Sequence, residues 1–388
     1  MGFFSRTPQK NERTLILHIG SGSVMASMVT NSDTKTAIHS FVTHDIPVVA
    51  DLTLETFEKE MNKALGRTIT AIAAHHMPAP DRITVYFASP WFASQVRIAK
   101  TSRPTPFIVS DTMVSDMIAR ELKAFENEEL AGTENIRDTL RPIGSKVVQV
   151  KVDGVAHNSP LGMSARELEL SIFVSVAPEH VLRMCEDTIM RRYHAPIAFS
   201  SFLLASFVVT RDTFANVHDY LLVDIGGEVT DVSLVRGGSL FQSVSFPHGS
   251  HFVLRKLSAG LHRSMTESMS LCMLYMENTL EESIKNSVGI ILKDAKKVWT
   301  ESFSAALSSV TGDKSIPSTI LFSTGEHMAS FFVDVIQHAD FQNHIYNEKK
   351  IKVVELKSEI FHEFLTFDSG VERNAFIMIE ALHAGKQK

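Results

Sequence analysis

The chain has 388 residues, of which 44% are hydrophobic and 21% are charged, and its formal net charge is −6. This composition excludes a mainly disordered chain and provides no overall positive field for a nucleic acid. We therefore expect a globular protein of about two domains that binds no nucleic acid. The two cysteines, Cys185 and Cys272, are too few for a disulfide framework or a structural zinc site, which favours the reducing cytoplasm.

The chain contains no uncharged stretch that predicts a membrane-spanning helix, and its start, MGFFSRTPQK, lacks the pattern of a secretory signal. We expect residues 1–13 to form a flexible tail. Direct contact with a membrane would then be limited to the tip of this tail, where Phe3 and Phe4 lie beside Arg6.

Hydrophobic periodicity predicts alternating strands and helices along the rest of the chain. Ser110 is expected to cap a helix, and an acid-rich stretch from Glu126 to Asn135 to form a surface loop. In the first half of the chain we expect a strand, turn and strand over 14–29, a helix over 54–65, a strand over 83–98, the helix after Ser110, strands over 146–152 and 167–176, and a helix from Pro178. In the second half we expect another strand, turn and strand over 220–235, a strand over 239–246, and helices over 276–292 and 295–310. A strand, turn and helix over 320–332 and a buried closing helix over 375–382 complete the expected elements.

Three glycine-containing turns directly follow apolar strands. Such turns leave backbone N–H groups free, and several N–H groups that point into one cavity can bind phosphate. The turns are HIGSGS from His18, DIGGEVTD from Asp224 and STGE from Ser323. We expect them to bind phosphate groups through Gly20, Ser21, Gly22, Ser23, Asp224, Gly226, Gly227, Glu228, Thr230, Asp231, Ser323, Thr324, Gly325 and Glu326.

The second turn also carries two carboxylates and a hydroxyl group. Asp224 and Asp231 are placed to hold Mg²⁺ through water, and Thr230 adds a hydroxyl donor. The second turn is therefore expected to hold Mg²⁺ beside bound phosphate.

The order and spacing of these turns resemble the actin-like ATPase superfamily, in which HIGSGS would be the first phosphate loop, DIGGEVTD the second, and ILFSTGEHMASFF the adenosine motif. Between the first two loops the chain resembles the FtsA/PilM type, through ITVYFASPWF and NSPLGMSARELEL. The resemblance implies an α/β, two-lobed, actin-like (ribonuclease H-like) fold with an inserted 1C subdomain. It divides the chain into a tail (1–13), the first half of subdomain 1A (14–82), the insert (83–193), the second half of 1A (194–217) and a second lobe (218–388) whose last helix closes back on the first lobe.

The resemblance also implies a nucleotide-binding scaffold at the cytoplasmic face of the membrane, which binds ATP or ADP with Mg²⁺ through the residues of the three turns. The segment NSPLGM, from Asn158 to Met163, favours an FtsA-like role in assembling the cell-division complex. The alternative is a PilM-like platform protein of type IV pilus assembly, favoured because the chain does not end in the amphipathic membrane helix of FtsA. The implied partners are proteins of either membrane complex, bound through the insert, and the family also implies self-association into filaments.

Some residues depart from the family pattern. His18 stands where the first loop usually has an aspartate, Met25 where a lysine often follows, and Glu326 where a second glycine is normal. His18 and Glu326 predict an ATPase that is slow at most, because metal positioning supplies much of phosphoryl-transfer catalysis. The family places an acidic residue and a lysine beside the nucleoside, which here would be Glu282 and Lys285. A metabolic kinase on the same fold is the least favoured alternative, because the insert lacks a polar sugar-binding cluster.

Overall fold

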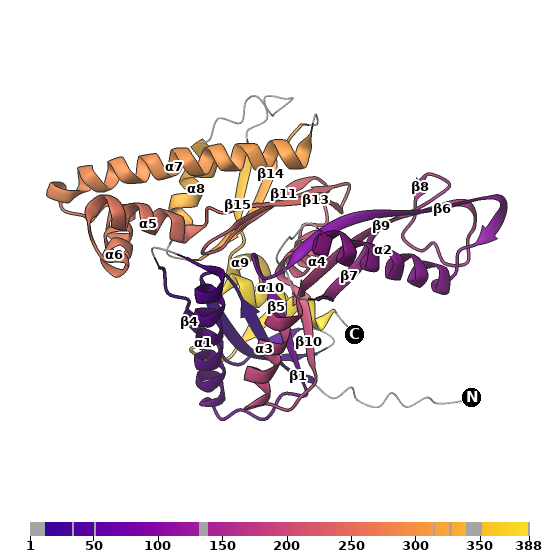
Figure 1. Cartoon of the computed structure of the whole chain (residues 1–388), viewed down its shortest axis with the longest axis horizontal. Coiled ribbons are helices and arrows are strands. Elements are labelled where there is room, and N and C mark those ends of the chain that lie inside the picture. The colour runs from indigo at the N-terminus through magenta and orange to yellow at the C-terminus, as the bar shows by residue number, and fades with distance from the viewer. Residues whose placement is uncertain are drawn as a thin grey trace.

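The computed structural model describes residues 12–32, 35–49, 52–131, 139–312, 315–325, 328–338 and 351–386. Two lobes, each built on its own β-sheet, lie one above the other, and a third sheet extends to one side of them (Figure 1). Of the expected tail, residues 12 and 13 already belong to the first strand, and Phe3 and Phe4 lie outside the described residues.

The first lobe is built on a sheet of seven strands within the described residues. Strands β1, β2 and β3 are antiparallel neighbours, and β5 and β10 extend the sheet parallel to β1. β4 pairs with β2, and β16 pairs with β3. The strands are β1 (Glu12–Ile19), β2 (Ser23–Asn31), β3 (Thr36–Ile38), β4 (Val42–Asp45), β5 (Arg82–Phe87), β10 (Ile197–Ser201) and β16 (Leu365–Phe367).

The second lobe repeats this arrangement in a sheet of five strands, counted over the described part of the chain. β11, β12 and β13 are antiparallel neighbours, and β14 and β15 extend the sheet parallel to β11. Both expected patterns of strand, glycine turn and strand are confirmed, as β1 with β2 and as β11 with β12. The strands are β11 (Tyr220–Ile225), β12 (Thr230–Arg236), β13 (Ser239–Phe246), β14 (Thr319–Thr324) and β15 (Lys352–Glu355).

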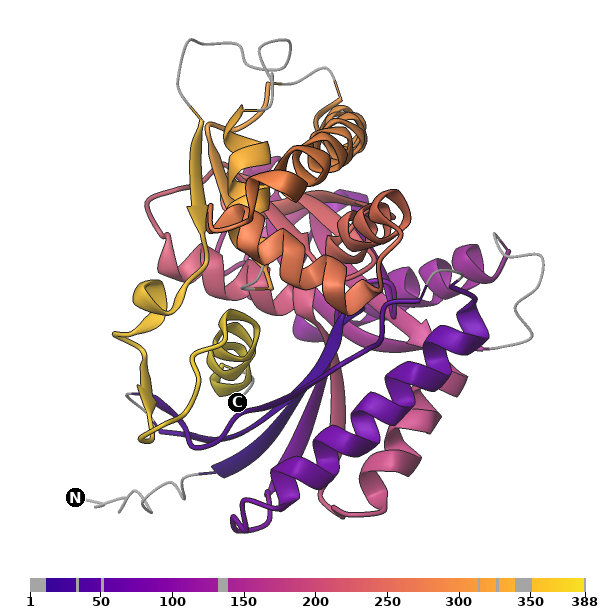
Figure 2. The same cartoon turned by 90° about the vertical axis from the view of Figure 1, so that its left-hand side faces the viewer.

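Helices cover both sheets, which explains why the central strands are apolar on both faces. α1 and α3 cover the outer face of the first sheet, and α5, α6, α7 and α8 cover the outer face of the second. α4 and α10 pack between the two lobes (Figures 1 and 2). No helix in the described part of the chain is both long and apolar enough to cross a membrane. The helices are α1 (Leu54–Ala73), α3 (Glu179–Met190), α4 (Phe202–Thr213), α5 (Ser250–Leu261), α6 (Met265–Met276), α7 (Glu282–Thr311), α8 (Ala329–His338), α9 (Ser358–Phe361) and α10 (Ala375–Gly385).

Several expected elements differ in extent from the structure. The strand expected over 83–98 is two strands: β5 ends at Phe87 in the first sheet, and a second strand, β6 (Ala93–Ile108), belongs to another sheet. The helix expected over 54–65 continues to Ala73, because its apolar face persists through Ile72. The two helices expected over 276–292 and 295–310 merge into one helix, α7, which begins at Glu282, whereas Met276 ends α6. Lys293 and Asp294 lie on the exposed side of α7 and do not interrupt it. The stretch from Glu126 that was expected to be a loop belongs to the helix α2 (Asp111–Ala131) as far as Ala131, and 132–138 lie outside the described residues.

A third, four-stranded sheet forms the insert. β6 (Ala93–Ile108), β9 (Ser164–Pro178), β7 (Leu140–Val152) and β8 (Val155–Ala156) pair in this order, and α2 (Asp111–Ala131) packs on one face. The insert was expected over 83–193. Because β5 pairs within the first sheet and α3 packs on α1, we propose narrower bounds of 93–178 for it.

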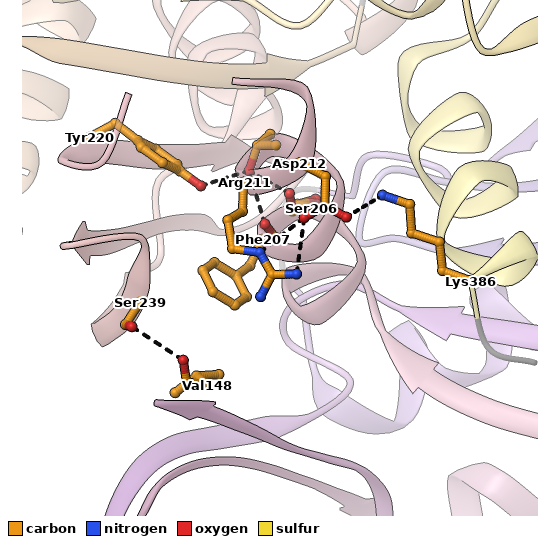
Figure 3. Close-up of polar contacts among 9 residues, drawn as sticks. Val148, Ser206, Phe207, Arg211, Asp212, Tyr220, Ser239 and Lys386 are labelled. Carbon is orange, nitrogen blue, oxygen red and sulfur yellow. Dashed lines mark hydrogen bonds and ion pairs between the residues drawn. The ribbon is translucent and has the colours of Figure 1, made fainter. Parts of the chain in front are cut away.

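Polar contacts fasten the insert and the C-terminal helix where the lobes meet (Figure 3). Ser239 Oγ of β13 donates to the Val148 carbonyl of β7 at 3.2 Å. Lys386 Nζ, at the end of α10, donates to Asp212 Oδ2 of α4 at 2.5 Å. The insert is thus tied to β13 of the second lobe, and the last helix is tied to α4, which packs between the lobes.

Candidate functional site

A cavity of about 510 Å³ lies between the lobes, which is within the usual size of a small-molecule site. The first and second glycine turns line it from opposite lobes, and Gly325 of the third turn lines it as well. The segment from Asp45 to Val48 and one face of α6 complete its walls. Residues that are about two hundred positions apart in the chain therefore meet in one cleft.

The first turn connects β1 to β2, and three hydrogen bonds to or from its backbone hold it in place. Gly20 N–H donates to the Ser23 carbonyl at 3.0 Å, the indole N–H of Trp91 donates to the Gly20 carbonyl at 2.8 Å, and Ile46 N–H donates to the Gly22 carbonyl at 2.8 Å. Among the described residues, the N–H groups of Ser21 and Gly22 have no hydrogen-bond partner. They are the free donors of this turn, as a phosphate-binding turn requires.

The second turn packs directly on the first. Glu228 N–H donates to Ser21 Oγ at 3.0 Å, and a Cβ atom at Gly226 would lie 2.7 Å from that same oxygen. A Cβ atom at Gly227 would lie 2.6 Å from the Cα of Gly22. No larger residue fits at these two glycines unless the turns separate, so the turns form a single backbone junction.

The start of α5 is bonded to the second turn. Ser250 N–H donates to the Gly226 carbonyl at 2.9 Å, and His251 N–H donates to the Gly227 carbonyl at 2.8 Å. These bonds occupy N–H groups that a helix N-terminus otherwise leaves free. Among the described residues, the N–H of Gly227 in the second turn has no hydrogen-bond partner, so it remains available to an anion together with the free donors of the first turn.

Asp224 and Asp231 lie opposite each other on β11 and β12, but only Asp224 lines the cleft. Ser323 Oγ donates to Asp224 Oδ1 at 2.8 Å, whereas Asp231 Oδ1 accepts from Ser89 Oγ at 2.9 Å and from Ser245 Oγ at 2.5 Å. Burial raises the pKa of Asp224 to about 7, with the charge of Asp231 adding to the shift, and burial raises the pKa of Asp231 to about 6.

This donor set fits a magnesium ion only in part. No group of three or more His, Cys, Asp or Glu side chains within the described ranges is arranged to hold a metal. Mg²⁺ can nevertheless bind through one carboxylate together with phosphate oxygens. Asp224 would be that carboxylate, while the side chain of Asp231 is engaged with the two serines.

Other predicted residues have structural partners. Thr230 Oγ1 donates to the His248 carbonyl at 2.8 Å, on the side of β12 away from the cleft lining. Ser323 holds Asp224, and Thr324 is 8% exposed and does not line the cleft. Glu326, expected to crowd the nucleotide, lies outside the described residues.

Glu282 and Lys285 form an ion pair of 3.0 Å at the start of α7, and the side chain of Glu282 is 81% exposed. Neither residue lines the cleft. Met265, Thr266, Met269 and Ser270 of the preceding helix, α6, line it in their place. α6 is not among the helices expected from the sequence, although the Ser264-x-x-Glu267 capping box at its start indicates a helix N-terminus.

Two buried histidines border the turns, and each contacts a carboxylate. His18 Nδ1 lies 2.6 Å from Glu380 Oε1 of α10. His251 Nδ1 lies 2.9 Å from Glu228 Oε1, and Arg255 also donates to Glu228. Burial opposes ionisation of Glu228, but the bonds from His251 and Arg255 lower its pKa to about 2. His251, Glu228 and Arg255 thus form a charged network behind the second turn.

Comparison with known proteins identifies the fold of the chain. No family model and no curated protein matches the chain. Among solved structures, the PilM component of the PilM-PilN type IV pilus biogenesis complex is similar, at 11% identity, over 96% of both chains, with a TM-score of 0.62. The ethanolamine utilization protein EutJ from Carboxydothermus hydrogenoformans matches at 9% identity over 90% of this chain and 86% of that chain, with a TM-score of 0.43. The fold expected from the sequence is therefore confirmed: the chain has the two-lobed actin-like ATPase fold with the FtsA/PilM-type insert.

Proposed function

We propose that this protein is a PilM-type scaffold that binds ATP or ADP, with Mg²⁺ at Asp224, in the cleft between its lobes. In this role it attaches, at the cytoplasmic face of the membrane, to a partner protein of a pilus-assembly complex. The observation that carries the proposal is the likeness to PilM over nearly the whole length of both chains, insert included. Any ATP hydrolysis is expected to be slow, because the first turn presents His18 and no carboxylate.

A second cavity supports attachment of a partner. It has a volume of about 490 Å³ and lies between β13 and the insert strands β6, β7 and β9. Ile98, 64% exposed, and Phe241, 48% exposed, line it together with serine and glutamine side chains. Three charged residues, Lys151, Glu169 and Arg236, also line it. β13 is the edge strand of the second sheet, and the insert strands β6 and β7 lie beside it.

A capture experiment tests the proposal. The tagged full-length chain, recovered from its native cells, is expected to retain pilus-assembly proteins. Ile98→Asp with Phe241→Asp should abolish this capture, while Ile290→Asp, which changes a 71% exposed residue on α7, should leave it intact. Capture of no membrane-complex protein by the wild type would contradict the proposed role, and undiminished capture by the double variant would exclude the cavity as the attachment site.

The division role is the second candidate, and it is favoured by one segment. Leu161 of the NSPLGM stretch is 56% exposed at the turn before β9, where it could meet another protein. If the captured proteins belong to the division complex, and Leu161→Asp removes them, the division role would replace the pilus role.

A further inference from the structure

His18 and His251 approach the glycine junction from opposite lobes in the same way. His18 lies near the end of β1, and its Nε2 would stand 3.0 Å from a Cβ atom at Gly20. His251 lies in the first turn of α5, and its Nε2 would stand 3.5 Å from a Cβ atom at Gly22. Each ring therefore turns Nδ1 toward a carboxylate and Nε2 toward the first turn.

The two rings are held firmly in these orientations. His18 is 2% exposed, and its ring packs on Phe202 at 5.4 Å and on Phe376 at 5.0 Å between ring centroids. His251 is 7% exposed and is held through Glu228. Both histidines line the cleft, and Nε2 of neither ring has a hydrogen-bond partner among the described residues.

The cleft otherwise lacks positive side chains. None of its described lining residues is a lysine or an arginine, and its carboxylates are Asp45 and Asp224. A di- or triphosphate carries several negative charges, so the cleft must provide donors from another source if it is to bind one.

We propose that His18 and His251 are phosphate-binding residues, which donate Nε2–H from the two lobes to the phosphate chain of the cleft ligand. In each ring the contact of Nδ1 with a carboxylate leaves Nε2 facing the first turn, where an N–H group on Nε2 can donate to a phosphate oxygen. Glu380 and Glu228 act as positioning residues that fix the ring. The ligand class is an organic or inorganic polyphosphate, and nucleotide as the natural ligand rests on the proposed function above.

Calorimetric titrations with ADP, adenosine and inorganic tripolyphosphate test this inference in the full-length chain. The wild type should bind ADP at least tenfold more tightly than adenosine. His18→Ala and His251→Ala should each reduce that preference about tenfold, which corresponds to one charge-assisted hydrogen bond. Because adenosine lacks phosphate, its affinity should stay within threefold, whereas general damage to the cleft would weaken both ligands alike. Glu380→Gln should reduce the same preference in part.

A matched control is available outside the cleft. His39 also pairs through Nδ1 with a carboxylate, that of Asp368 at 3.0 Å, and does not line the cleft, so His39→Ala should keep the wild-type preference. A preference for ADP that survives in both histidine variants would overturn the inference and leave the nucleotide proposal standing. Histidine-dependent binding of tripolyphosphate without binding of ADP would support the inference and overturn the nucleotide proposal. Binding of neither ligand by the wild type would overturn both.

Discussion

Gly22 and Gly227 touch through their backbones, since a Cβ atom at Gly227 would lie 2.6 Å from the Cα of Gly22 and 2.7 Å from its nitrogen. The first predicted variant is therefore Gly227→Ala. It should separate the two turns, cost about 1–3 kcal/mol in the free energy of unfolding and reduce ADP affinity at least tenfold. Urea unfolding and calorimetric titration measure the two effects.

Gly66→Ala is the control for that variant. A Cβ atom at Gly66, inside α1, would meet only Thr188 Cγ2, at 4.0 Å. This change should stabilise the protein by about 0.5–1 kcal/mol, through helix propensity, without altering affinity. Unchanged ADP affinity in Gly227→Ala would show that the junction of the turns is not needed for binding.

The pH dependence of stability should reveal the buried carboxylates. The pKa of Asp224 rises from its ordinary 3.8 to about 7 in the folded chain, because of burial and the neighbouring Asp231. The folded state then binds this proton more tightly than the unfolded state, so the stabilisation is complete at low pH and is lost as the pH rises from about 4 to 7. We expect Asp224→Asn to gain roughly 2 kcal/mol relative to the wild type between pH 5 and pH 8. A difference that is flat with pH in paired denaturation curves would contradict this assignment.

Local patterns explain what the sequence could predict. The apolar strands on either side of Gly20 and of Gly226 give both hairpins, because strand periodicity and glycine turns are short-range signals. α7 appears interrupted in the sequence at Lys293 and Asp294, yet an exposed face tolerates both residues. The three predicted phosphate-site turns do meet in one cleft. Their meeting could be predicted because their order along the chain resembles a known arrangement.

Side-chain contacts between residues that are far apart in the chain could not be predicted from the sequence. His18 and Glu380 are 362 positions apart, and no periodicity connects a strand end to a helix at the other end of the chain. Glu228 was expected in the nucleotide site, but His251 and Arg255 bind its side chain, a contact set by how α5 packs on the second turn. Likewise, the spacing of Glu282 and Lys285 cannot show that their helix turns them away from the cleft.

The buried pair of His18 and Glu380 should be strongly coupled in folding. Removing one partner leaves the other buried without compensation, so His18→Leu and Glu380→Leu should each cost about 3–5 kcal/mol. The double variant should cost clearly less than the sum of the two. Chemical denaturation of all four proteins of the cycle measures the coupling, and simple additivity would mean that the two side chains do not interact.

The nucleoside end of the cleft should be formed by α6 and not by the start of α7. Met269→Glu places a charge on the lining helix and should reduce the affinity for adenosine about tenfold or more. Lys285→Ala removes only the exposed ion pair with Glu282, so it should change that affinity less than twofold. If titration showed that Lys285→Ala weakens adenosine binding and Met269→Glu does not, the nucleoside site would lie at Glu282 and Lys285.

Hydrogen exchange of the full-length chain, with and without ADP, tests the shared cleft most directly. We predict that ADP slows exchange at Ser21 and Gly22 of the first lobe and at Gly227 and Glu228 of the second lobe together, because these amides belong to one junction. Protection limited to one lobe, or protection at the groove between β13 and the insert in place of the turns, would contradict the account.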